Sequence, residues 1–393
     1  MSATSTYIHS FLPEALHPFV SLSYPVAPIQ TPLTKLRLHP ARKRDPTAQQ
    51  LYGQGPKDVY FVVFCALAFT LLREICLRYV LSAFARRWLL RARRREQAAK
   101  DETSRRPMTK LEKRKMEHTV TRFAEQGWSF LYCTTYWLLG GYILSRIPAP
   151  FSPESIWATY PNTHLPPLTK FYYLSQLGWW FHQLYVINTE KRRNDHWQMF
   201  GHHILTIVLI TGSYIAHFTR IGTILHFLMD LCDIFLPVSV GRAQQRSCPD
   251  TQLAKMLRYL SLTTLCDLTF VVFLVAWLFS RQIGLALVIR TCYHDAPRFI
   301  PFKWDPSQGM YLTQGTYYGF ISLIVVLFVL ASIWFYMACS VAVRVIRGLG
   351  AEDSRSDDEG DEEGEKDVLD QVPESASASV TGQNGAAVRR RRK

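Results

Sequence analysis

Long apolar runs separated by charged connectors constrain this chain of 393 residues more than any other feature. A run of about 20 apolar residues matches the hydrocarbon thickness of a bilayer, and helices satisfy their backbone groups inside lipid. The sequence therefore predicts an all-α integral membrane protein with about seven transmembrane helices. The apolar runs lie near residues 59–81, 127–147, 170–188, 199–218, 221–240, 258–280 and 313–343.

Basic residues are concentrated in alternate connectors between these runs. Residues 86–115 contain thirteen Lys or Arg, whereas residues 148–169 contain none, and the connectors 189–197 and 241–258 are basic again. Connectors rich in Lys and Arg remain on the cytosolic side. The pattern predicts a lumenal N-terminus and a cytosolic C-terminus, and it assigns the net charge of +14 to membrane surfaces rather than to nucleic acid.

The composition divides the chain into five parts. The tail carries an acidic block, a Ser/Ala stretch and a terminal RRRRK, none of which can bury a core, so we expect it to be disordered. The expected parts are an irregular N-terminal segment (1–57), a first transmembrane helix (58–83), a basic cytosolic connector (84–116), a helical domain (117–347) and the acidic and basic cytosolic tail (348–393).

Two adjacent histidines, His202 and His203, stand near the start of the fourth apolar run. Ionisable groups at membrane depth are candidates for functional sites, and imidazole titrates near neutral pH. Adjacent positions on a helix diverge by about 100°. We therefore expect one imidazole to face an internal cavity while the other supports it.

Two carboxylates, Asp230 and Asp233, share one face of the fifth run with His226. Each unpaired carboxylate at the bilayer centre costs about 2.5–3.5 kcal/mol on insertion scales. The aspartates therefore require partners, and histidine is the natural one. A purely structural interhelical hydrogen bond is the alternative interpretation for the aspartates and for His226.

Neither a metal centre nor a cofactor is expected. Membrane di-iron oxidases need several clustered histidine motifs, whereas this chain has one adjacent pair and the isolated His182, His196, His217 and His226. No P-loop, dinucleotide fingerprint or nucleophile elbow is present. Most of the eight cysteines fall inside the apolar runs, so no lumenal disulfide is required.

The segment RRNDHWQMFGHHILTIVLITGSYIAHFTRIGTILHFLMDLCDIFL resembles the Lag1 motif of ceramide synthases, within the TRAM–Lag1–CLN8 (TLC) family. The resemblance extends over roughly residues 50–347, and YGQGPKDVYF resembles the segment that precedes the domain in fungal members. It implies that six helices form a bundle around an internal cavity. The matching positions are Asp195, His202-His203, Ser213-Tyr214, Arg220-x-Gly222 and Asp230-x-x-Asp233.

The resemblance implies a sphingoid-base N-acyltransferase of the endoplasmic reticulum. Such an enzyme transfers a fatty acyl group from acyl-CoA, a substrate rather than a cofactor, to the 2-amino group of sphinganine or phytosphingosine. His202 would attack the thioester or deprotonate the amine, and the division of roles with His203 stays open. The implied catalytic residues are His202, His203, Asp230 and Asp233, and the substrate-binding candidates are Asp195, Arg192, Arg193, Tyr214 and His226.

The chain departs from the family pattern at three places. Fungal members usually carry one more span before YGQGPKD, and residues 1–25 hold only a broken remnant of it. Residues 239–253 look like an insertion at the cytosolic end of the fifth run, and Cys232 stands where relatives usually carry Ser. Two alternatives therefore stay open: a divergent paralogue that confers self-resistance to sphinganine-analogue mycotoxins, and a non-catalytic lipid-sensing TLC protein. A homo- or hetero-oligomer with other synthase subunits is implied by the resemblance alone.

Overall fold

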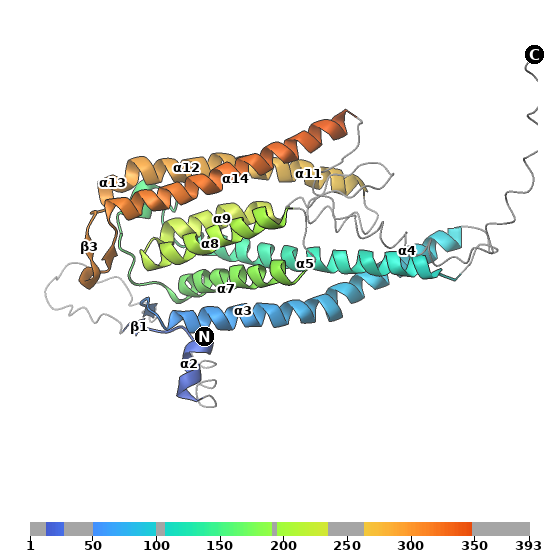
Figure 1. Ribbon diagram of the computed structural model, residues 1–393, viewed down its shortest axis with the longest axis horizontal. Helices are drawn as coiled ribbons and strands as arrows, with labels where there is room; N and C mark the ends of the chain where they lie inside the picture. The colour runs from blue at the N-terminus through green and yellow to red at the C-terminus, as the bar shows by residue number, and fades with distance from the viewer. Residues whose placement is uncertain (1–12, 27–49, 100–106, 191–194, 235–262, 348–393) are drawn as a thin grey trace, which may run out of the picture.

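The computed structural model describes residues 13–26, 50–99, 107–190, 195–234 and 263–347. Long helices run along one common axis and form a bundle (Figure 1). The expected insertion at 239–253 and the tail at 348–393 lie outside the described residues. The helices of the bundle are α3 (Asp58–Ile75), α5 (Lys110–Ser145), α7 (Pro167–Thr189), α8 (His196–Ile215), α9 (Thr219–Ile234), α11 (Thr263–Trp277) and α14 (Gln314–Ile346).

Two of these helices continue through wider, π-helical turns. The first helix runs from α3 through η2 (Cys76–Leu81) into α4 (Ser82–Ala99). It enters the expected connector 84–116 as helix because Arg, Ala, Leu and Gln are good helix formers. The other continues from α11 through η4 (Leu278–Gly284), α12 (Leu285–Arg290), η5 (Thr291–Asp295) and α13 (Ala296–Phe299).

Local sequence signals determine where several helices begin. At α5, the Thr109 side chain accepts a hydrogen bond from the backbone N–H of Glu112, and the Glu112 side chain accepts one from the backbone N–H of Thr109. This reciprocal capping box satisfies two backbone donors at the start of the helix. At α7, Pro167 occupies the first turn, where its missing N–H costs nothing.

Three described helices are long and apolar enough to cross a membrane by length and composition: Asp58–Arg95, Phe270–Phe299 and Gln314–Arg344. Large apolar side chains on α3 point outward, with Leu67 and Leu71 each 66% exposed, as a lipid-facing surface requires. The protein is therefore a helical, multi-pass membrane protein. Each of the seven apolar runs overlaps a described helix, while the number of crossings stays a prediction.

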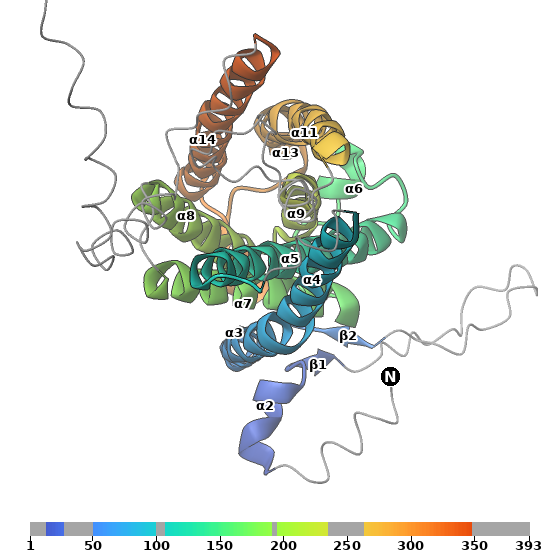
Figure 2. The ribbon, with the colours of Figure 1, turned by 90° about the vertical axis from the view of Figure 1, so that its right-hand side faces the viewer.

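Helix α9 occupies the middle of the bundle (Figure 2). It packs against α5, α8, η4 and α12, and α7 approaches it closely at a glycine. A Cβ atom on Gly222 would lie 1.9 Å from the Tyr173 hydroxyl oxygen, so this position accepts no larger side chain without a shift of Tyr173. A helix buried on all sides can present polar residues to an interior rather than to lipid.

A buried ion pair ties the segment before α3 to the bundle. Lys170 on α7 is fully buried, and its Nζ lies 2.7 Å from Asp58 Oδ1. The same Nζ donates to the backbone oxygens of Ser23 and Gly53. Two short antiparallel strands, β1 (Pro25–Val26) and β2 (Leu51–Tyr52), lie beside it. A second hairpin, β3 (Trp304–Asp305) and β4 (Met310–Tyr311), precedes α14. The short elements η1 (Glu14–Leu16), α2 (His17–Val20), α6 (Pro153–Trp157) and η6 (Pro306–Gln308) complete the described structure.

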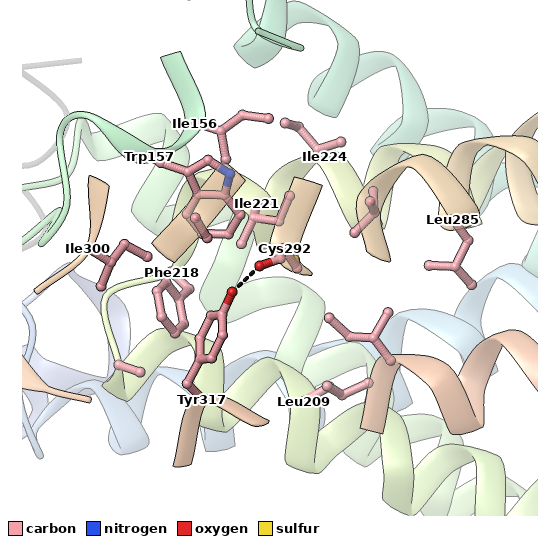
Figure 3. Packing of buried hydrophobic residues seen from close by; sticks show 14 of the residues in the cluster. Ile156, Trp157, Leu209, Phe218, Ile221, Ile224, Leu285, Cys292, Ile300 and Tyr317 are labelled. Carbon is pink, nitrogen blue, oxygen red and sulfur yellow. Dashed lines mark hydrogen bonds between the residues drawn. The ribbon is translucent and has the colours of Figure 1, made fainter. Parts of the chain in front are cut away.

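The largest apolar core lies at the end of the bundle where α8 ends and α9 begins. Figure 3 shows its side chains converging from α6, α8, α9, the α11–α13 run and α14. The Tyr317 hydroxyl donates to the backbone oxygen of Cys292 across this core, so this buried polar group has a hydrogen-bond partner in its apolar surroundings. The labelled members include Trp157, Phe218, Ile221, Leu285 and Ile300.

Candidate functional site

A cavity within the described part of the chain connects His202 to this apolar core. Its walls come from α8, α9, α14 and the η4–η5 part of the α11–α13 run, with contributions from α6 and α7. Along α9, the lining extends from Asp233 to Ile221, twelve residues or about 18 Å at the rise of an α-helix. The cavity is therefore elongated along the bundle axis.

The lining changes character from one end of the cavity to the other. Polar and charged residues gather at one end: His202, Asp230, Asp233 and Arg281. Apolar and aromatic residues dominate the other end, among them Leu209, Phe218, Ile221, Phe320 and Ile324. Pockets that are mostly apolar with a few convergent polar groups are typical binding sites for amphiphilic small molecules. The shape and polarity suit a ligand with a long hydrocarbon chain and a polar reacting end.

The structure distinguishes between the two adjacent histidines. His202 lines the cavity, and its ring lies edge-on to Trp180 and Trp334, with centroid distances of 5.6 and 5.3 Å. Its Nδ1 atom is buried and has no hydrogen-bond partner among the residues described. Two aromatic rings thus fix the orientation of the His202 ring at the cavity wall.

His203 has a different environment. It does not line the cavity, and its Nδ1 lies 2.6 Å from the backbone oxygen of Met199, one turn earlier in α8. Since a carbonyl oxygen only accepts, Nδ1 carries the proton in this contact. The ring also packs against Trp180. This is the arrangement that the divergence of adjacent helix positions predicts, with one imidazole at the cavity and the other beside it.

The two aspartates do not hydrogen-bond the histidines in the described structure, unlike the expectation from sequence. Asp230 Oδ2 accepts a hydrogen bond of 2.8 Å from Gln176 Nε2 on α7. Asp233 pairs with the guanidinium of Arg281 on η4. Arg281 also donates to the backbone oxygen of Met229 at 3.0 Å and lies over the ring of Trp277. An amide and a guanidinium therefore take the places where imidazoles were expected.

The substrate-binding candidates are spread over three parts of the molecule. His226 lines the cavity one turn from Asp230, and its ring meets Tyr173 edge-on at 5.4 Å. The Tyr214 hydroxyl instead donates to Asp58 Oδ2 at 2.8 Å, in the buried ion-pair cluster away from the cavity lining. Asp195 precedes the first residue of α8 and makes no side-chain cap. Arg192 and Arg193 lie outside the described residues.

Three residues of the site were not expected from the sequence: Arg281, Gln176 and Trp180. A detectable signal exists for Arg281, because a lone charge inside the apolar stretch VVFLVAWLFSRQIGLALVI requires a buried partner. Arg281 lies on the π-helical segment η4, and single π-helical turns are frequent at functional sites. Gln176 and Trp180 carry no such signal, because neutral side chains within a transmembrane helix have many structural uses.

No group of three or more His, Cys, Asp or Glu side chains that could hold a metal ion occurs within the described ranges.

Comparisons with known proteins identify relatives over most of the chain. The model of the TLC domain family matches residues 122–242 and 247–340. The chain is 37% identical over 313 residues to Sphingosine N-acyltransferase lag1 of Schizosaccharomyces pombe, covering 79% of this chain and 70% of that protein. It is 32% identical over 367 residues to Ceramide Synthase FUM18 of Gibberella moniliformis, covering 86% and 77%. Ceramide synthase LAG1 of Saccharomyces cerevisiae is 26% identical over 325 residues, covering 80% and 68%.

Proposed function

The chain belongs to the TLC domain family, and from its similarity to Sphingosine N-acyltransferase lag1 and Ceramide Synthase FUM18 we infer that it is a ceramide synthase, a sphingosine N-acyltransferase. It transfers a fatty acyl group from acyl-CoA to the 2-amino group of a sphingoid base. One observation carries the inference to the site: His202 lines the polar end of an apolar cavity that also contains Asp230 and Asp233. The acyl chain occupies the apolar part, and the thioester lies beside His202.

The reaction needs a base and an acyl acceptor near the thioester. The ammonium group of the base first gives up one proton to the solvent. The free amine nitrogen then forms a bond to the carbonyl carbon, the carbon–sulfur bond breaks, and the nitrogen loses a second proton. His202 performs the proton transfer, or takes the acyl group itself before the amine attacks. His203 supports the His202 ring through their shared contact with Trp180. The CoA thiolate takes up a proton as it leaves, so the balance needs no cofactor.

The basic connectors support an orientation for the site. His202 follows the connector 189–197 closely, and connectors rich in Lys and Arg remain cytosolic. The polar end of the cavity therefore opens toward the cytosol, where the charged CoA portion stays in water while its acyl chain enters the bundle. Arg192 and Arg193 attract the CoA phosphates. With this orientation the N-terminus is lumenal, and the protein resides in the endoplasmic reticulum membrane.

His226 faces the part of the cavity next to Asp230 and contacts the sphingoid base there. Tyr214 is bonded to Asp58, so its hydroxyl supports the fold rather than the substrate. The oligomeric state and the partner subunits stay predictions, as does the role of Asp195.

An amide-forming assay tests the function. Purified membranes containing the full chain receive sphinganine and acyl-CoAs of several lengths, and the ceramide product is measured by mass spectrometry. We expect product from the wild type and none above background from His202→Ala. His196→Ala is the matched control, because His196 is buried on the same helix and does not line the cavity; it should retain activity.

The same assay separates the alternatives. A non-catalytic lipid-sensing protein would give no amide with any acyl-CoA. A self-resistance paralogue would form the amide and also continue to do so in the presence of a sphinganine-analogue mycotoxin that blocks a sensitive synthase.

A further inference from the structure

The two aspartates of the site have partners of different charge. Asp233 is paired with the Arg281 cation, so its negative charge is compensated inside the protein. Asp230 is 5% exposed, and within the described ranges its side chain bonds only the neutral amide of Gln176. A buried carboxylate is stable when a cation compensates it. Of the two, Asp230 is therefore the carboxylate left to receive a cation from a ligand.

One oxygen of Asp230 is held and the other is not. Oδ2 accepts from Gln176 Nε2 at 2.8 Å, while Oδ1 accepts from no described residue. Asp230 lines the cavity, and Gln176 does not. The Gln176 amide therefore holds the Asp230 carboxylate from the side away from the cavity, and it does not contact a ligand in the cavity.

A third residue fixes the orientation of the amide. The Tyr132 hydroxyl donates to Gln176 Oε1 at 2.6 Å, and Gln176 is completely buried. A carboxylate only accepts hydrogen bonds, so the amide must turn its NH₂ toward Asp230 and its oxygen toward Tyr132. The Tyr132 ring stacks on Trp179. Tyr132, Gln176 and Asp230 come from α5, α7 and α9, so one chain of hydrogen bonds joins these three helices and ends at a single carboxylate oxygen.

We propose that Gln176 is a positioning residue that holds Asp230 toward the ammonium group of the sphingoid base, with Tyr132 holding the Gln176 amide. The proposal rests on the ceramide synthase function inferred above. The acyl-CoA substrate carries no cation at its reacting end, so the sphingoid base is the substrate that needs Asp230. Loss of the Gln176 bond should then affect the use of the base and leave the use of acyl-CoA unchanged.

Gln176→Met tests the proposal, since methionine has a similar length and volume but lacks both polar atoms. We expect kcat/KM for sphinganine to fall roughly tenfold or more, the range for a hydrogen bond to a charged group, while KM for acyl-CoA stays at the wild-type value. Ser175→Ala is the matched control: Ser175 is the neighbouring residue, is similarly buried and donates to backbone oxygens of its own helix. Its kcat/KM for sphinganine should stay at the wild-type value, because Ser175 makes no contact with Asp230.

Tyr132→Phe provides a second variant that preserves the packing of the ring. It removes only the hydroxyl, so the amide keeps its place but can rotate away from Asp230. We expect a smaller fall in kcat/KM for sphinganine, and the double variant Tyr132→Phe/Gln176→Met should be no worse than Gln176→Met alone.

A double-mutant cycle with Asp230→Asn separates positioning from a general structural role. Binding of radiolabelled sphinganine to the purified full chain is measured, so the cycle can be completed without turnover. If Gln176 acts through Asp230, adding Gln176→Met to Asp230→Asn weakens binding no further. Equal losses in both backgrounds, or unchanged use of sphinganine by Gln176→Met, would overturn the proposal. Absence of amide product from the wild type would instead overturn the proposed function.

Discussion

At the scale of single residues, the Arg281–Asp233 pair explains how a cation and a carboxylate can lie inside an apolar bundle. Arg281 is 3% exposed and uses one nitrogen for both Asp233 and the backbone oxygen of Met229. Its Nε atom is buried without a partner among the described residues. The pair therefore neutralises Asp233 and leaves the Nε–H of the guanidinium without a partner among the described residues.

Removal of either member of this pair should destabilise the protein more than removal of both. Arg281→Gln leaves Asp233 as an uncompensated buried charge, and breaking a buried pair costs about 3–5 kcal/mol. We expect the thermal unfolding midpoint in detergent to drop, and to recover in large part in Arg281→Gln/Asp233→Asn. A double variant that is less stable than either single variant would show that the two side chains do not compensate each other.

Gly222 supports a second prediction at this scale. A Cβ atom there would lie 1.9 Å from the Tyr173 hydroxyl oxygen and 2.8 Å from Cζ of the same ring. Gly222→Ala should lower the free energy of unfolding by about 1–3 kcal/mol, the usual cost of overpacking. Unfolding midpoints check it. Tyr173→Phe in the same background removes the closest atom and should restore part of the loss, whereas a Gly222→Ala protein of wild-type stability would contradict this packing.

The site residues differ in how far the sequence predicts them. The placement of His226, Asp230 and Asp233 on one face of α9 follows from spacing, because four residues make about one turn. Spacing does not predict that His202 of α8 lines the same cavity. The hydrogen-bond partners of the aspartates do not follow from spacing. Gln176 and Arg281 come from other helices, and the local pattern of one helix contains no information on which residue of a neighbour it meets. Histidine was the chemically reasonable partner, and the fold brings an amide and a guanidinium instead.

At the scale of elements, the position of the helices is predictable and their ends are less so. Apolar runs indicate where each helix lies. The sixth apolar run is predicted to end at residue 280, yet the helical run continues through Arg281 to Phe299. The physical reason is the Asp233 partner, which removes the cost of the charge. Similarly, the helix that begins at α3 continues to Ala99, since leaving the apolar region ends a span and not a helix.

The contact between α3, α7 and α8 leads to a prediction for this scale. Lys170, Asp58 and Tyr214 form one buried cluster that joins these three helices. Lys170→Met leaves Asp58 buried without its cation and should lower stability by about 3–5 kcal/mol. Lys303→Met is the matched control, since the Lys303–Asp305 pair is solvent-exposed at Lys303 and should leave the unfolding midpoint unchanged. Equal effects of the two substitutions would refute a structural role for the buried cluster.

At the scale of the whole molecule, the bundle separates chemistry from chain recognition along one axis. The reacting side chains lie at one end of the cavity, and the apolar core lies at the other. Trp157 stands at that far end, 3% exposed, and its indole N–H donates to Thr291 Oγ1 at 3.2 Å. Trp157 and Tyr317 are both tied by hydrogen bonds to the α11–α13 run, which gives the cavity a fixed end wall.

A fixed end wall should limit the length of the acyl chain that reaches His202 in a productive position. Ile221 lines the cavity between the polar end and Trp157, so Ile221→Trp shortens the space by filling it. We expect the wild-type preference to shift toward shorter acyl-CoAs, with kcat/KM falling most for the longest chain, because overfilling excludes the terminal methylenes first. Trp157→Ala enlarges the far end and should shift the preference in the opposite direction. The profile of ceramides formed from an equimolar mixture of acyl-CoAs measures both shifts.

Val208→Trp is the control: Val208 lies on α8, is 47% exposed and does not line the cavity. If Ile221→Trp and Val208→Trp lower kcat/KM by the same factor for acyl-CoAs of every length, the cavity does not hold the acyl chain. Only an acyl chain that extends to the far end of the cavity is sensitive to the position of that end.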